Sequence, residues 1–252
     1  SDPHVQYDDY VRRVQRIVPI YWLLTALMIG FWVGLPNLYS SGAPDFARVL
    51  QSFLFSSLPT TGDMPIIYVG WSVEYEMLFY LAVFILLLGG RSPWAPIVTL
   101  FSWLVIFGRL LEINNSSEIQ APLLRFLTSS LLLEFSLGVC LGSWLKGHKL
   151  EFLSVISILI AFIFVGWSEF DRRALFVGLP SAIIVLVAMK FESRRHVHLW
   201  RPIIRAGDAS YSIYLFQVFA LSGSAKLVTT ISKEVSPDVF VLVTSIASVA
   251  MG

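Results

Sequence analysis

The sequence predicts an all-α protein, a polytopic bundle of about eight transmembrane helices that forms one domain over residues 1–252. Hydrophobic residues make up 56% of the chain and charged residues only 14%. The mean hydropathy is +0.73, which lies outside the range of soluble globular proteins. Several apolar stretches also approach the ~20 residues that a helix needs to cross a bilayer.

Eight apolar stretches predict the spans. They are residues 17–35, 66–88, 93–111, 122–145, 150–168, 174–190, 207–225 and 237–252. Because the chain begins Ser1-Asp2-Pro3 and stops inside an apolar run, we expect the natural protein to continue at both ends.

Basic residues predict the orientation of these spans. With a cytoplasmic N-terminus, eleven of the eighteen basic residues fall on the inner side, and the acidic loops at 45–63, 112–118 and 169–171 fall on the outer side. The eleven are Arg12, Arg13, Arg16, Arg91, Lys146, Lys149, Lys190, Arg194, Arg195, Arg201 and Arg205.

No metal site is expected. Cys140 is the only cysteine, so a disulfide or a thiolate metal site cannot form. His196 and His198 lack the i, i+4 spacing of a helical metal pair and have no acidic partner nearby. Walker, Rossmann, kinase and G-x-S-x-G motifs are absent as well.

The first informative stretch, Gly70 to Tyr80, places two carboxylates at the head of a membrane-length apolar segment. Ionisable groups there are costly and indicate a functional site. Helical geometry, about 100° per residue, sets Ser72, Glu76 and Tyr80 on one face and Glu74 almost opposite. The two acids are therefore not expected to act as a catalytic pair, and Glu74→Gln is expected to be mild if that residue faces the outer interface.

The second stretch carries Arg12, Arg13 and Arg16 just before a predicted span. Three guanidiniums at this spacing form a compact cationic patch that suits phosphate groups. A positive-inside anchor on anionic lipid explains the same pattern.

Two further polar features lie within predicted spans. Ser210, Tyr214 and Gln217 share one helical face, which is also typical of hydrogen bonding between helices. Glu134 is a third carboxylate inside a span, and the sequence leaves open whether it bonds to a neighbouring helix or lines a substrate path.

Together these stretches resemble the acyltransferase-3 integral-membrane acyltransferases, especially the branch that acetylates exopolysaccharides. Trp71, Ser72, Glu76 and Tyr80 match W-[ST]-x-x-x-E-x-x-F-Y. The segment from Arg12 to Trp22 matches R-R-x-x-R-I-x-P-x-Y-W, and the segment from Gly207 to Gln217 matches G-x-x-S-Y-x-x-Y-L-x-H, which includes Ser210, Tyr211 and Tyr214.

The resemblance implies an inner-membrane enzyme that moves an acyl group, usually acetyl, from cytoplasmic acyl-CoA to a hydroxyl of a saccharide or another envelope molecule. Glu76, supported by Tyr80, would serve the reaction, and Arg12, Arg13 and Arg16 would engage the phosphates of the donor. No bound cofactor is implied beyond acetyl-CoA or another acyl-CoA as donor substrate. The expected partners are membrane lipid and the acceptor, with no nucleic acid.

The chain departs from the family pattern at two points. Gln217 stands where histidine is usual, and glutamine cannot titrate near neutral pH. The family histidine precedes the R-R-x-x-R segment, so it lies upstream of residue 1, and His4, His148, His196 and His198 match no motif. We therefore expect residues 1–252 alone to be inactive, with the Glu76, Tyr80 and Ser210 faces converging on one cavity.

Two alternatives stay open. A polysaccharide or lipid transporter would also carry buried acids, although no paired halves appear in the sequence. A non-catalytic membrane scaffold would account for Gln217.

Overall fold

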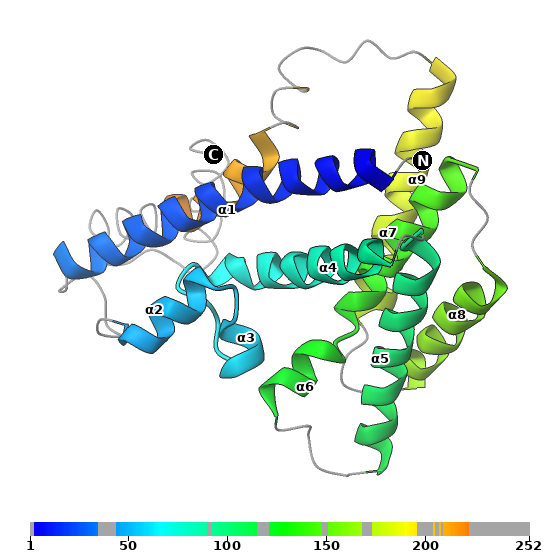
Figure 1. The fold of residues 1–252 in the computed structure, drawn as a ribbon, viewed down its shortest axis with the longest axis horizontal. Coiled ribbons are helices and arrows are strands. Elements are labelled where there is room, and N and C mark those ends of the chain that lie inside the picture. Colours follow the sequence, from blue (N-terminus) through cyan, green and yellow to red (C-terminus); the bar gives the residue numbers. More distant parts are fainter. Residues whose placement is uncertain are drawn as a thin grey trace, which may run out of the picture. The chain divides into compact units, whose positions relative to one another are not determined.

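A computed structural model of the chain describes residues 3–34, 44–89, 92–114, 121–147, 151–167, 173–195, 204, 207 and 209–221. Every regular element in these ranges is helical, which confirms the all-α prediction (Figure 1). The chain forms two compact units, one of residues 12–55, 64–73 and 199–252, and one of residues 1–11, 56–63 and 74–198. We call them the Arg12 unit and the Glu74 unit.

Five described helices are long and apolar enough to cross a membrane: Val11–Gly34, Tyr68–Leu88, Trp94–Leu111, Pro122–Leu145 and Ala174–Phe191. Two shorter apolar helices, Phe152–Gly166 and Ala209–Leu221, coincide with two more predicted spans. The eighth prediction, residues 237–252, lies outside the described residues. A polytopic bundle is confirmed, and the number eight stays a prediction.

The Arg12 unit is built on α1 (Pro3–Gly34), which buries one face. Residues at intervals of three, four and one form that face, as an amphipathic helix requires. They are Ile17, Tyr21, Leu24, Thr25 and Met28. Pro19 stands inside α1 and is exposed.

The short helix α2 (Phe46–Phe53) follows in the same unit. It begins where the Asp45 carboxylate accepts a hydrogen bond from the Arg48 amide at 2.9 Å, a standard N-cap. Phe46 and Leu50 are exposed, whereas Ser52 is buried. Exposed apolar side chains on an amphipathic helix are typical of a helix that lies in a membrane interface.

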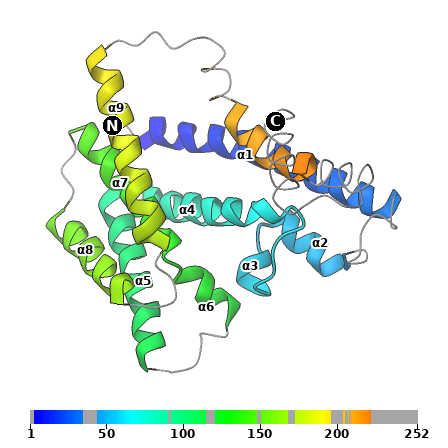
Figure 2. The ribbon, with the colours of Figure 1, turned by 180° about the vertical axis from the view of Figure 1, so that it is seen from behind.

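The Glu74 unit contains most of the remaining helices. These are α3 (Ser57–Thr60), most of α4 (Trp71–Leu88), α5 (Trp94–Asn114), α6 (Pro122–Leu127), α7 (Leu131–Leu145), α8 (Phe152–Trp167), η3 (Ala174–Gly178, a π-helical turn) and α9 (Leu179–Arg195). Helix α5 packs mainly against α8 and α7, and Figure 2 shows α5 and α8 side by side from behind as Figure 1 does from the front.

Small and polar residues join α5 to α8. The Ser154 hydroxyl donates to the Ala95 carbonyl at 3.0 Å and lies 3.1 Å from the Thr99 hydroxyl, which itself donates to the Ala95 carbonyl. Between apolar helices in lipid, close backbone approach and such hydroxyl bonds replace the hydrophobic driving force.

Aromatic rings join α4 to its neighbours within the Glu74 unit. The Phe79 ring stacks on Phe135 of α7 with centroids 5.2 Å apart and meets Phe101 of α5 edge-on at 6.3 Å. Tyr75 lies 4.4 Å from Phe126 of α6. The rings thus hold α4 against three helices of this unit.

The close approach of α5 to the end of α6 depends on Gly108. A Cβ atom at this position would lie 2.3 Å from Thr128 Cβ, far inside van der Waals contact. By contrast, a Cβ atom on Gly142 of α7 would meet nothing within 4 Å.

We therefore expect Gly108→Ala to destabilise the protein by about 1–3 kcal/mol through overpacking. Gly142→Ala, the matched control, should be neutral or slightly stabilising because alanine favours a helix. Thermal unfolding in detergent measures both. Equal unfolding temperatures for the two variants would show that α5 and the end of α6 are not in contact.

Candidate functional site

Tyr21 and Gly70 meet inside the Arg12 unit. Tyr21 is completely buried on α1, and a Cβ atom on Gly70 would lie 2.7 Å from its ring and 2.9 Å from its hydroxyl oxygen. Only glycine allows this approach without moving the ring. The contact joins the R-R-x-x-R-I-x-P-x-Y-W segment to the start of the W-S-x-x-x-E segment.

A hydroxyl cluster lies beside this contact in the same unit. The Tyr214 hydroxyl donates to the Val69 carbonyl at 3.1 Å and lies 2.9 Å from the Ser72 hydroxyl, which also approaches the Val69 carbonyl at 3.0 Å. Ser72 and Tyr214 are 142 positions apart in the sequence. Two of the predicted motifs therefore meet in space, through one carbonyl at the start of α4.

Side chains also satisfy the backbone that precedes α4. The Ser52 hydroxyl accepts from the Ile66 amide at 2.9 Å, and the Trp22 indole donates to the Phe53 carbonyl at 2.9 Å. Next to them, Phe55 has a φ of 54° and packs on Tyr21 with ring centroids 4.8 Å apart. A non-glycine residue with positive φ persists only where its surroundings hold it.

Arg12, Arg13 and Arg16 all have exposed side chains on the N-terminal half of α1. Arg13 lies about 80° around the helix from the buried Tyr21, and the other two lie farther round, by the 100° step per residue. Three exposed guanidiniums within about one turn of helix can reach phosphate groups of a soluble donor or of a lipid.

Glu76 and Tyr80 belong to the Glu74 unit and lie on one face of α4, as the helical spacing predicts. The Tyr80 hydroxyl donates a hydrogen bond to the Glu76 carboxylate. Tyr80 is buried and Glu76 is half-buried. A carboxylate held in this way can orient a partner group or accept a proton.

Glu74 does not meet the condition for a mild substitution. It is 1% exposed, and its carboxylate accepts hydrogen bonds from the backbone amides of Ser57 at 3.0 Å and Leu58 at 2.8 Å. These are the first two amides of α3, which have no partner inside a helix. Glu74 therefore anchors the segment before α4, a role that its position in the sequence did not indicate.

Glu134 lies in the first turn of α7 and forms an ion pair with Arg173, with Oε1 3.0 Å from Nε. Of the two roles that the sequence left open for Glu134, the bond to a neighbouring helix is present in the structure.

The remaining predicted residues have fewer described contacts. Trp71, Tyr211 and Gln217 are half-buried and Ser210 is exposed, and the last three lie on the helix Ala209–Leu221. His148, His196 and His198 lie outside the described residues. Glu76 and Tyr80 belong to the Glu74 unit and Ser210 to the Arg12 unit, so the convergence of the three on one cavity stays a prediction.

Sequence reasoning missed Tyr21, Gly70 and Trp22 as positioning residues. All three stand inside the matched segments, so the signal was present in the motif letters. The motifs did not indicate which of their residues touch. Tyr21 and Gly70 are 49 positions apart in the sequence, and no local pattern predicts such a contact.

Comparison with known proteins identifies the family of the chain. The family described as Acyltransferase domain, acyltransferase-3, matches residues 10–251. The chain belongs to the acyltransferase-3 family. Over 227 residues it is 36% identical to the exopolysaccharide production protein ExoZ of Rhizobium meliloti strain 1021, an alignment that covers 85% of this chain and 68% of that protein. No solved structure matches the chain.

This acyltransferase-3 chain is therefore an integral-membrane acyltransferase, as its apolar helices and its family both indicate. The family match covers the helices that carry all three motifs.

Glu74→Gln and Glu76→Gln should separate fold from chemistry. Glutamine at 74 keeps one acceptor oxygen and turns an NH₂ group toward a backbone amide, so we expect a loss of about 1–3 kcal/mol in unfolding free energy. Glutamine at 76 can still accept from Tyr80, so stability should hold while acyl transfer falls by ~10² or more.

Thermal unfolding and transfer assays on the complete natural protein measure these two effects. Glu151→Gln, an exposed acid at the start of α8, is the matched control and should change neither. Wild-type stability of Glu74→Gln would contradict the anchoring role of Glu74. Full transfer activity of Glu76→Gln would show that Glu76 takes no part in the reaction.

Proposed function

We propose that this acyltransferase moves an acetyl or other acyl group from acyl-CoA to a hydroxyl of an exopolysaccharide or of its lipid-linked precursor. The observation that carries the reaction class is the family match over residues 10–251. Similarity to a protein named for exopolysaccharide production supports the saccharide acceptor.

The reaction sets the requirements for the site. The acceptor oxygen attacks the thioester carbonyl, the carbon–sulfur bond breaks, and the hydroxyl proton leaves through a base while the CoA thiolate takes up a proton. Such a transfer needs a base, donors for the developing oxyanion and a cationic cradle for the phosphates of the donor.

Each unit of the chain offers a group for one of these tasks. Arg12, Arg13 and Arg16 supply the cradle, because guanidinium binds phosphate bidentately. In the Glu74 unit, Glu76 accepts a hydrogen bond from the Tyr80 hydroxyl and orients a partner or takes a proton. The resemblance to the family implies a histidine as the titratable base, and Gln217 cannot titrate near neutral pH.

We place the protein in the bacterial inner membrane with residue 1 on the cytoplasmic side. The excess of basic residues in the predicted inner loops supports this orientation. It puts the three arginines on the side where soluble acyl-CoA is present.

The double variant Arg13→Lys/Arg16→Lys tests the donor site. Lysine keeps the charge but loses the planar fork, so we expect the KM for acetyl-CoA to rise about tenfold with little change in membrane insertion. Transfer of radiolabelled acetyl from acetyl-CoA to membrane saccharide, over a range of acetyl-CoA concentrations, gives this value.

Lys146→Arg, exposed at the end of α7 and predicted on the same side, is the control and should leave the KM unchanged. Full activity with an unchanged KM in the double variant would assign the arginines to lipid anchoring. No label transfer by the wild-type protein from any acyl-CoA would contradict the proposed reaction.

A further inference from the structure

The apolar stretch Pro122–Leu145 is not a continuous helix. Helix α6 ends at Leu127 and α7 begins at Leu131, and the three residues between them all carry hydroxyl groups. Non-helical backbone at membrane depth is tolerated where it is buried in protein or lines a polar cavity. Interrupted helices of this kind form binding sites in other membrane proteins.

Local bonds fix the shape of this break. The Thr128 hydroxyl donates to the Leu124 carbonyl at 2.7 Å, which ends α6, and the Ser129 hydroxyl accepts from the Leu131 amide at 3.3 Å, which begins α7. Gly108 of α5 packs directly on Thr128. The interruption is therefore a built feature of the Glu74 unit.

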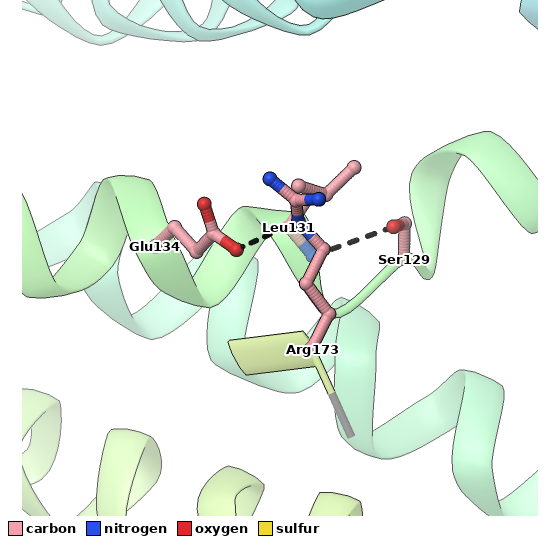
Figure 3. Close-up of polar contacts among 4 residues, drawn as sticks. All are labelled: Ser129, Leu131, Glu134 and Arg173. Carbon is pink, nitrogen blue, oxygen red and sulfur yellow. Dashed lines mark hydrogen bonds and ion pairs between the residues drawn. The ribbon is translucent and has the colours of Figure 1, made fainter. Parts of the chain in front are cut away.

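An ion pair lies one turn beyond the break. Figure 3 shows the Glu134 and Arg173 side chains pointing toward one another, with Ser129 and Leu131 next to them. Their side chains remain 27% and 44% exposed, respectively. A pair that served only to hold two helices together in lipid would gain from complete burial, because exposed charge in hydrocarbon is costly.

The helix that carries Arg173 is itself irregular at this point. Residues Ala174–Gly178 form a π-helical turn, a rare form that is frequent at functional sites. In an α-helix Arg173 and Gly178 would lie about 140° apart, whereas the wider turn brings both to Glu134. A Cβ atom on Gly178 would lie 3.0 Å from Glu134 Cγ, so only glycine at this position avoids a close contact with the Glu134 side chain.

We propose that Glu134, Arg173 and the hydroxyl of Ser129 form a binding site for a neutral, hydroxyl-rich saccharide, the acceptor of the transfer. The inference rests on the proposed function. A sugar hydroxyl donates to the carboxylate and accepts from the guanidinium, so neighbouring hydroxyls match the pair. The pair has no net charge, so it gives an anionic or a cationic ligand no net electrostatic attraction.

The orientation proposed above is consistent with this assignment. Helix α7 runs antiparallel to α5, and α9 runs parallel to α7 (Figure 1), so the break before α7 and the π-turn before α9 lie toward the end of the Glu74 unit where α5 ends. With residue 1 in the cytoplasm that end faces outwards, where an envelope saccharide is exposed.

The test compares Glu134→Gln and Arg173→Lys with Glu151→Gln in the complete natural protein. The probe is an oligosaccharide pool from chemically de-esterified bacterial exopolysaccharide, separated into neutral and acidic fractions. Tryptophan fluorescence reports binding without chemistry, acetyl transfer gives KM for the pool and for acetyl-CoA, and thermal unfolding reports the fold.

We expect both site variants to bind the neutral oligosaccharides about tenfold more weakly than the wild-type protein does. The KM for the oligosaccharide pool should rise to the same extent. The KM for acetyl-CoA, the unfolding temperature and the Glu151→Gln control should stay unchanged. Arg173→Lys keeps the ion pair with Glu134 and so guards against loss of the fold.

Three results overturn the proposal: unchanged binding in both variants, loss of binding in step with the unfolding temperature, or binding of the acidic fraction alone. If the wild-type protein binds the neutral fraction through Glu134 and Arg173 yet transfers no acetyl group, the proposed function fails and the binding site stands. If transfer persists while both variants bind normally, the binding site fails alone.

Discussion

Hydrogen bonding of the irregular backbone before α4 is the constraint on which the motif residues depend. In an apolar environment each unpaired amide or carbonyl costs several kcal/mol. In the Arg12 unit, Trp22, Ser52 and Tyr214 bond to backbone groups of residues 53, 66 and 69. In the Glu74 unit, Glu74 bonds to the amides of residues 57 and 58. Helix α4, which carries Glu76, starts at the end of this backbone.

This constraint changes how the family motifs are interpreted. Two motif residues with hydroxyl groups also bond to the backbone, because Ser72 and Tyr214 share the Val69 carbonyl. Glu74 stands at a variable position of the motif and binds the first amides of α3. Glu76 differs because its described partner is a side chain, that of Tyr80. Of the two neighbouring acids, Glu74 anchors the fold and Glu76 remains available for a partner.

The sequence predicted the helices well because long apolar runs and helical periodicity are local properties. The common face of Glu76 and Tyr80 followed from the same periodicity. The burial of Glu74, the break at residues 128–130 and the π-turn at Ala174 could not be predicted, because each depends on packing against distant residues such as Ser57, Gly108 and Glu134. Similarly, the motif letters did not indicate which residues of the Arg12 unit would touch.

Amide hydrogen exchange tests the central claim most directly. The Ile66 amide bonds to Ser52 and the Gly70 amide bonds to the Ile67 carbonyl at 2.8 Å, so both should be protected in the wild-type protein. In Ser72→Ala/Tyr214→Phe the Val69 carbonyl loses both of its side-chain donors, and we predict that peptides covering residues 64–70 exchange at least about tenfold faster. Equal exchange in the two proteins would contradict it.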